Sequence, residues 1–161
     1  MKKILVTAVV AGLIGFAAGN AFFYLASPLW IDREVNETLP AELMVSTLAT
    51  GQFTDADSFH QGSGTATVVE TAGGAGIVRL TDFEVTNGPD LEVWLVKNGD
   101  ITSSSDVTDS EWVSLGQLKG NIGDQNYIVP EGTDLSEFGS VVIWCEQFSV
   151  LFSAATLVTE S

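Results

Sequence analysis

Two side chains in this 161-residue sequence stand out because each is the only one of its type: Cys145 and His60. A cysteine can act as a redox thiol or bind iron and other soft metals, and a histidine can bind a metal or carry a proton. With one of each, a single chain cannot assemble a blue-copper site, which needs two histidines and a cysteine, or a zinc site made only of cysteines and histidines. An intrachain disulfide is excluded by the same count.

Cys145 lies in the run 141–148, at the end of its apolar part 141–145, and two interpretations of it compete. A cysteine in such a run packs as a small buried hydrophobe, or it is placed there for chemistry. The neighbouring Glu146 and the negative charge of the chain oppose formation of a thiolate, whereas coordination to a metal or haem iron would deprotonate the thiol directly. A third interpretation, a disulfide between two chains, is the least compatible with an apolar strand.

His60 lies in a polar loop, 55–64, and also has two interpretations. It is a turn residue hydrogen-bonded to a nearby carboxylate such as Asp57, or it is an axial ligand or proton carrier that pairs in space with Cys145. The acidic residues of the chain lack the spacing of a calcium-binding EF-hand loop, so we expect no separate metal site.

The N-terminus carries an uncharged stretch, 4–31, which is long enough to span a bilayer. Lys2 and Lys3 precede it, so we expect an anchor over 1–30 with a cytoplasmic N-terminus and an extracytoplasmic C-terminal domain in the cell membrane. The alternative is a signal peptide cleaved near 19–21. In both cases the domain is exported, to the periplasm or the extracellular side.

The charge of the chain restricts its partners. It has 21 acidic residues against 6 basic ones and a formal net charge of −15. A field of this sign repels phosphate backbones, so a nucleic-acid partner is not expected.

Downstream of an expected stalk or linker over 31–49, the sequence changes to short runs rich in Val, Ile, Thr and Phe between Gly, Asn and Asp clusters. The run 141–145 is apolar on both faces and predicts a central strand, whereas the alternation over 148–153 predicts a half-buried one. We predict an all-β domain over 50–158, an antiparallel β-sandwich or flattened barrel of about seven to eight strands. The predicted strands are 64–70, 77–85, 91–96, 112–116, 125–129, 141–145 and 148–153.

Several segments together resemble the DM13 domain family, also called the electron transfer DM13 domain. They are 51–53, 56–64, 79–83, 88–91, 115–121, 123–127 and 142–145, with Phe148. The resemblance implies a β-rich extracellular module whose characteristic cysteine, here Cys145, takes part in redox chemistry, as a bare thiol or by holding a prosthetic group such as haem. Cys145 would then be the catalytic and cofactor-binding residue, with His60 as its helper.

The leading hypothesis is therefore a membrane-anchored, extracytoplasmic electron-transfer module centred on Cys145, with haem as the expected cofactor if there is one. Its partners would be the membrane, through the N-terminal helix, and a redox partner protein. The alternative is a non-catalytic ligand-binding or adhesion module at the cell surface, in which Cys145 is core packing. The sequence leaves open whether the domain is an enzyme.

Overall fold

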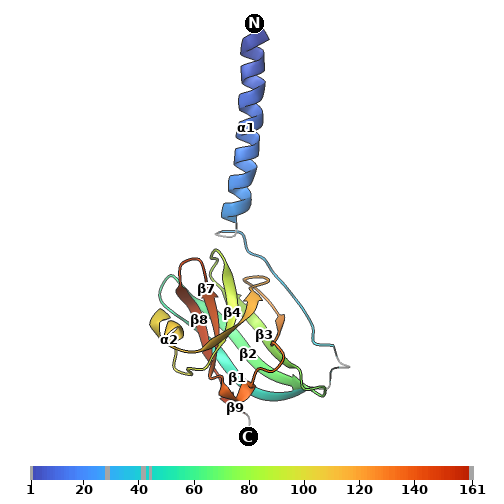
Figure 1. Cartoon of the computed structure of the whole chain (residues 1–161), viewed down its shortest axis with the longest axis vertical. Coiled ribbons are helices and arrows are strands. Elements are labelled where there is room, and N and C mark those ends of the chain that lie inside the picture. Colours follow the sequence, from blue (N-terminus) through green and yellow to red (C-terminus); the bar gives the residue numbers. More distant parts are fainter. Residues whose placement is uncertain (1, 28–29, 41–42, 44, 160–161) are drawn as a thin grey trace. The chain divides into compact units, whose positions relative to one another are not determined.

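The chain divides into two compact units, Met1–Ile31 and Asp32–Ser161, and the computed structural model describes residues 2–27, 30–40, 43 and 45–159. The first unit contains helix α1, Lys2–Ala26, drawn in blue in Figure 1. Beyond its two lysines the helix has no charged side chain, so apolar groups surround it on every side. By length and composition its stretch Lys2–Tyr24 can cross a membrane, and a signal sequence would pass the same criteria.

The second unit is one sheet of antiparallel strands in the order β5-β4-β7-β8-β1-β2-β3-β6, with β9 paired to β1. The strands at the two ends of this order, β5 and β6, approach each other, so the sheet curls into a nearly closed barrel (Figure 1). The predicted all-β antiparallel fold is confirmed. In the described part of the chain the elements of this unit are β1 (Val45–Asp55), β2 (Gly62–Thr71), β3 (Gly76–Val85), β4 (Leu91–Val96), α2 (Ser104–Thr108), β5 (Trp112–Gln117), β6 (Gln125–Ile128), a 3₁₀ turn (Leu135–Glu137), β7 (Ser140–Cys145), β8 (Val150–Thr156) and β9 (Val158–Thr159).

Two strands differ from their predicted pattern. β7 is buried at every position between β4 and β8, as expected of a central strand. β8 begins at Val150 and not at Phe148, and the prediction that it is half-buried is wrong because Leu151 and Ser153 are buried as well as Phe152. Side chains pack on both faces of the sheet here, and β8 is buried from Leu151 to Ala155, with a register shift between β7 and β8.

Apolar side chains pack on both faces of this sheet. The interior of the barrel holds the larger cluster, which includes Phe83 and Cys145. A second cluster lies on the outer face of β4 and β7 and contains Trp94, Trp144 and Val107 of α2. Because side chains alternate along a strand, the consecutive residues Trp144 and Cys145 belong to different clusters.

The segment 32–38 is bound to the loop that joins β5 to β6. The Glu37 backbone N–H donates to the Asp124 carbonyl oxygen at 2.8 Å. Both Glu37 carboxylate oxygens lie 2.8 Å from Lys119 Nζ, and this contact lowers the pKa of Glu37 below its ordinary value. Part of the segment expected to be a stalk is thus hydrogen-bonded to the barrel, and β1 begins within it at Val45. Residues 41, 42 and 44 of the expected stalk lie outside the described residues.

Candidate functional site

Cys145 is the last residue of β7, where the strand enters the turn toward β8. Its side chain is 0% exposed, and its Sγ donates a hydrogen bond to the Pro89 carbonyl oxygen at 3.0 Å. Its partners across the sheet are Leu91 in β4 and Val150 in β8. The thiol is therefore enclosed at one end of the barrel, with no side-chain surface open to solvent.

The surroundings of Sγ oppose ionisation. Burial is the largest effect and raises the pKa of the Cys145 thiol above its ordinary value, and the charge of Asp90 adds to the increase. The backbone N–H groups of Phe148 and Gln147 act in the opposite direction and lower the pKa. Cys145 is therefore a neutral thiol at neutral pH. A nucleophile needs the thiolate and access to its target, and this sulfur has neither.

Two tight turns, 87–90 and 146–149, close the barrel around the sulfur. Asp90 and Ser149 have φ values of 53° and 54°, in the left-handed region that few residues other than glycine adopt. The Glu146 N–H in the second turn donates to the Asp90 carbonyl oxygen in the first, at 3.1 Å. The two turns beside Sγ are therefore bonded to each other as well as to the barrel.

His60 lies in the turn between β1 and β2. Its Nδ1 is 2.8 Å from Asp57 Oδ2, and the hydrogen bond from His60 lowers the pKa of Asp57 to about 2. The His60 ring also packs against the Phe152 ring, with 4.3 Å between the centroids. This is the carboxylate contact that the sequence offered as one of two interpretations of His60.

Phe152 connects the surroundings of the two candidate residues. It belongs to the same interior cluster as Cys145, while its ring contacts His60. Among the described residues, which include both side chains, no hydrogen bond joins His60 to Cys145. Sequence reasoning missed Phe152 and Pro89, and no local signal could have revealed them, because only folding brings Pro89 to Cys145 and Phe152 to His60.

A haem held by Cys145 can be tested against this arrangement. A thiolate ligand must face a space large enough for the macrocycle, and its sulfur must be free to bind iron. Here Sγ is fully buried and its hydrogen bond points to the Pro89 carbonyl. The residues as they lie do not fit direct ligation of haem, so no step of the chemistry is assigned to it.

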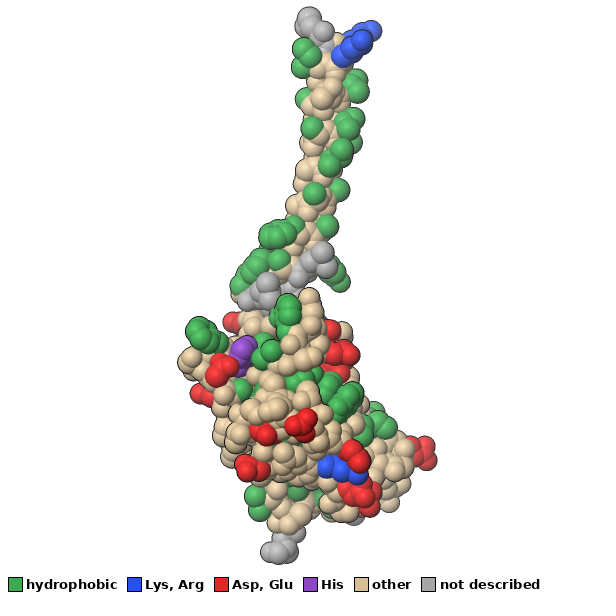
Figure 2. All heavy atoms as spheres, turned by 60° about the vertical axis from the view of Figure 1, so that its left-hand side comes forward, with side chains coloured by type: hydrophobic (Ala, Val, Ile, Leu, Met, Phe, Trp, Pro, Cys, Tyr) green, Lys and Arg blue, Asp and Glu red, His purple; other side chains and the backbone are tan. Residues whose placement is uncertain are grey.

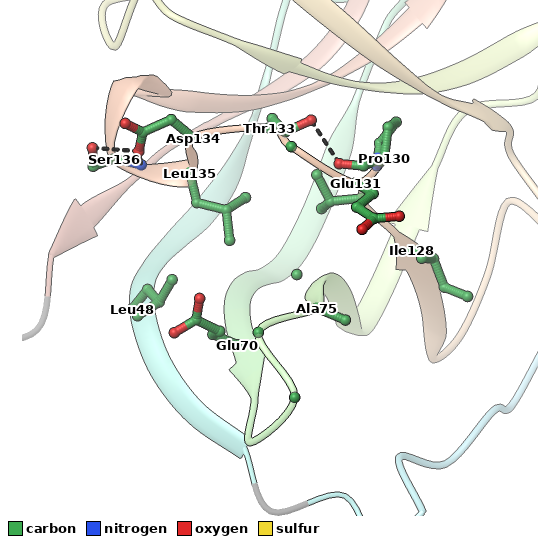
Figure 3. Close-up of a pocket in the computed structure, with 15 residues that line it drawn as sticks. Leu48, Glu70, Ala75, Ile128, Pro130, Glu131, Thr133, Asp134, Leu135 and Ser136 are labelled. Atoms are coloured by element: carbon green, nitrogen blue, oxygen red, sulfur yellow. Dashed lines mark hydrogen bonds between the residues drawn. The ribbon is translucent and has the colours of Figure 1, made fainter.

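A cavity of about 620 Å³ lies at the opposite end of the barrel, between the turn 73–76 and the segment 128–136. In Figure 3 the side chains of Leu48 and Leu135 are on one side of the cavity and Ile128 is on the other. Among the described residues that line it, three have acidic side chains and none is a lysine or arginine. The acidic residues are Glu70, Glu131 and Asp134.

The surface of the barrel is acidic as the composition requires. Figure 2 shows acidic side chains spread over the face that it displays, with few basic ones among them. Several of the acids are satisfied locally: Lys97, for example, lies 2.6 Å from Glu111 and 2.9 Å from Glu137. The field outside the barrel therefore favours neutral or cationic partners.

A model of the family described as Electron transfer DM13 matches residues 52–157. The chain belongs to the DM13 family. The resemblance seen in the sequence is thereby confirmed, and an electron-transfer role in general is supported for this DM13 domain. No curated protein matches the chain, and no solved structure does. The DM13 match includes Cys145 and His60 and leaves α1 outside it.

Proposed function

We propose that the DM13 domain is an extracytoplasmic electron-transfer module, held at a membrane by α1, with Cys145 as its redox residue. The observation that carries the proposal is the family match over 52–157, which includes the only cysteine of the chain. The lysines at the start of α1 favour a cytoplasmic N-terminus and an exported domain.

The burial of Cys145 restricts the chemistry. Formation of a disulfide or a sulfenic acid needs an oxidant in contact with the sulfur, and the thiolate reacts fastest. Sγ is buried and protonated, so both routes are slow in the closed barrel. Exchange of a single electron needs no such contact. We therefore infer that an oxidised one-electron carrier protein gains one electron from Cys145, that the S–H proton is released to solvent when the turns over Sγ open, and that Cys145 becomes a thiyl radical until it is reduced again.

The direct test compares the full-length protein in detergent with Cys145→Ala. We expect the native thiol to react with a maleimide only after unfolding, and a strong one-electron oxidant to remove one more electron per chain from the parent protein than from Cys145→Ala. Cys145→Val is the control that fills the same space without sulfur. Equal electron loss from all three proteins would reject Cys145 as the redox residue.

Anchoring and orientation have their own test. The mass of the protein recovered from membranes distinguishes an intact α1 from a cleaved signal peptide. Protease added outside vesicles of known orientation should digest the barrel and spare α1 if the domain faces outward. Protection of the barrel would reverse the proposed topology.

Haem stays a separate prediction within this proposal. If Cys145 and His60 hold it, addition of haem to the full-length protein should produce a Soret band that changes in Cys145→Ala and in His60→Ala. The packing of Sγ against Pro89 gives this arrangement no support. A spectrum that is the same in both variants and in the parent protein would remove haem ligation by these residues.

A second candidate function is ligand binding at the far end of the barrel, with Cys145 as a packing residue. The cavity there supports it, because an apolar wall beside three carboxylates suits a small molecule with an apolar body and a positively charged group. An alkylammonium probe should raise the melting temperature of the parent protein and have a smaller effect on Glu70→Gln and Glu131→Gln. An equal shift in all three proteins would place binding elsewhere.

A further inference from the structure

Three tryptophan rings form a continuous row on the outer face of the barrel. Trp94 in β4 stacks on Trp112 in β5, with 3.9 Å between the ring centroids and 12° between the planes. On its other side Trp94 lies 5.3 Å from the ring of Trp144 in β7, at 31°. The row therefore crosses three neighbouring strands, from the centre of the sheet to its edge.

Strand register produces this row. Trp94 pairs with Val142, whereas Trp144 pairs with Glu92, so the two rings are diagonal neighbours on one face of β4 and β7. Trp112 pairs with Val96, two residues beyond Trp94 on that same face. Diagonal neighbours lie within reach of aromatic side chains, and each of these pairs makes contact for that reason.

The row leads from the core to solvent. Trp144 is 2% exposed, Trp94 is 5% exposed and Trp112 is 46% exposed. Trp144, the inner end of the row, directly precedes the proposed redox residue Cys145 in the chain. The outer end presents an indole directly to whatever approaches β5.

The central indole has a proton acceptor in place. Trp94 Nε1 donates to Glu92 Oε2 at 2.7 Å, and Ser114 Oγ donates to the same oxygen at 2.6 Å. An indole that loses an electron becomes a much stronger acid, and a carboxylate at hydrogen-bond distance can accept its proton directly. Packing alone does not require a carboxylate on this nitrogen, since water or a carbonyl would satisfy it equally.

We propose that Trp144, Trp94 and Trp112 form an electron relay whose surface terminus is Trp112, and that a neutral or cationic one-electron oxidant accepts electrons there. The proposal deepens the electron-transfer function and rests on it. In one step the oxidant gains one electron from Trp112, Trp94 replaces that electron, and the Trp94 Nε1 proton passes to Glu92. The products are the reduced oxidant, a neutral Trp94 radical and a protonated Glu92. An electron from Cys145, passed through Trp144, and the proton from Glu92 then restore Trp94, which leaves Cys145 as a thiyl radical with its S–H proton released.

The test uses flash photolysis with a ruthenium(III) polypyridyl oxidant, which is cationic, on the full-length protein in detergent. Every protein carries Trp30→Phe, because Trp30 is 54% exposed and would be oxidised in the background. In this parent we expect the absorption of a neutral indolyl radical. Trp112→Phe should lose most of the radical yield, since Trp94 is shielded. Glu92→Gln keeps an acceptor for the indole N–H but cannot take the proton, so the radical should remain in its protonated form.

Three results would overturn the relay: an unchanged yield in Trp112→Phe, a neutral radical formed at the same rate in Glu92→Gln, or a parent protein that forms no indolyl radical. Near-ultraviolet circular dichroism of each variant checks that the tryptophan cluster is folded. Trp112→Tyr keeps a large oxidisable ring and should recover part of the radical yield that is lost in Trp112→Phe.

A Cys145→Ala arm separates this proposal from the function it rests on. If the radical forms and lives longer without Cys145, the relay and the redox role of Cys145 are both supported. If it forms and decays identically with and without Cys145, the relay stands and Cys145 is not its electron source. If no radical forms in either protein, the relay fails, and the oxidant titration of Cys145 decides the proposed function independently.

Discussion

The two faces of β7 bury their side chains equally well but differ in how they connect to solvent. Cys145 on the inner face and Trp144 on the outer face are 0% and 2% exposed. The inner face ends at the sulfur, under two hydrogen-bonded turns. The outer face continues from ring to ring until it reaches Trp112 at the surface. The exposed fraction of a residue therefore shows whether a reagent can reach it. It does not show whether contacting rings connect it to the surface for electron transfer.

The polar groups near each face differ accordingly. On the inner face the desolvated thiol has a neutral carbonyl as its acceptor, and its pKa is raised. On the outer face the half-buried Glu92 sits beside Trp94 and accepts from both the indole and Ser114. A carboxylate is tolerated there because it is hydrogen-bonded and near the edge of the sheet. The outer face is thus the one equipped to move a proton together with an electron.

The largest predicted effect tests whether the outer face is a true core. Trp144→Ala should destabilise the protein by about 3–5 kcal/mol and Ile143→Ala, on the inner face, by about 2–5 kcal/mol, because each leaves a cavity in a packed cluster. Urea unfolding followed by far-ultraviolet circular dichroism measures both without relying on indole fluorescence. A cost below about 1 kcal/mol for Trp144→Ala would mean that the outer cluster contributes little.

The next effect concerns the closed end of the inner face. A Cβ added at Gly88 would lie 2.6 Å from two atoms of the Phe152 ring and 3.1 Å from Leu91 Cδ2. Gly88→Ala should therefore cost about 1–3 kcal/mol by overpacking, and it should increase the maleimide reactivity of Cys145 if Phe152 shields the sulfur.

The matched control for Gly88→Ala is Gly73→Ala, in a turn at the other end of the barrel. A Cβ there would meet only Thr71 Oγ1, at 3.8 Å. Its stability should stay within about 0.5 kcal/mol of the parent and its thiol reactivity should not change. Equal thiol reactivity in the two variants would show that the shielding of Sγ does not depend on Phe152.

The fold could be predicted from the sequence where strands have strong local signals. β7 was recognisable because consecutive β-branched and aromatic residues leave no polar face. β1 was not, because Val45–Asp55 mixes polar and apolar residues and becomes a strand through its pairing with β2 and β8. The prediction that β8 is half-buried failed for a related reason. A register shift involves two paired strands and cannot be read from the sequence of either strand alone.

The candidate site could be predicted only as a set of residue types. The apolar run around Cys145 indicated burial, but the acceptor of its thiol, Pro89, is 56 positions away in the chain. The contact of His60 with Asp57 was predictable, because the two residues are three positions apart, whereas its contact with Phe152 was not. The composition shows which reactive side chains are present, and the strand register decides which of them lie next to each other.

A smaller effect is expected at the solvent end of the tryptophan row. Trp112→Ala removes the stacked pair with Trp94 and should cost about 0.5–1.5 kcal/mol. The control is Phe59→Ala, an aromatic residue that is 81% exposed, whose removal should change stability by less than about 0.5 kcal/mol. Equal costs at the two positions would mean that the stack contributes nothing to stability beyond ordinary surface contact.

The smallest effect at neutral pH, and the sharpest probe of the inner face, comes from Cys145→Val. Val is apolar and only one methyl group larger, so the cost near neutral pH should be about 1 kcal/mol. The folded-state pKa of Cys145 is raised above its ordinary value of 9.0, so the unfolded chain ionises first as the pH rises. The parent protein then loses stability between pH 9.0 and the higher folded-state pKa. Cys145→Val has no thiol and lacks this loss.

The difference in unfolding free energy between the two proteins, measured against pH, removes contributions from other alkaline groups such as Tyr127. A difference that stays constant into the alkaline range would show that Sγ is solvated in the folded state, and the contrast between the two faces of β7 would no longer hold.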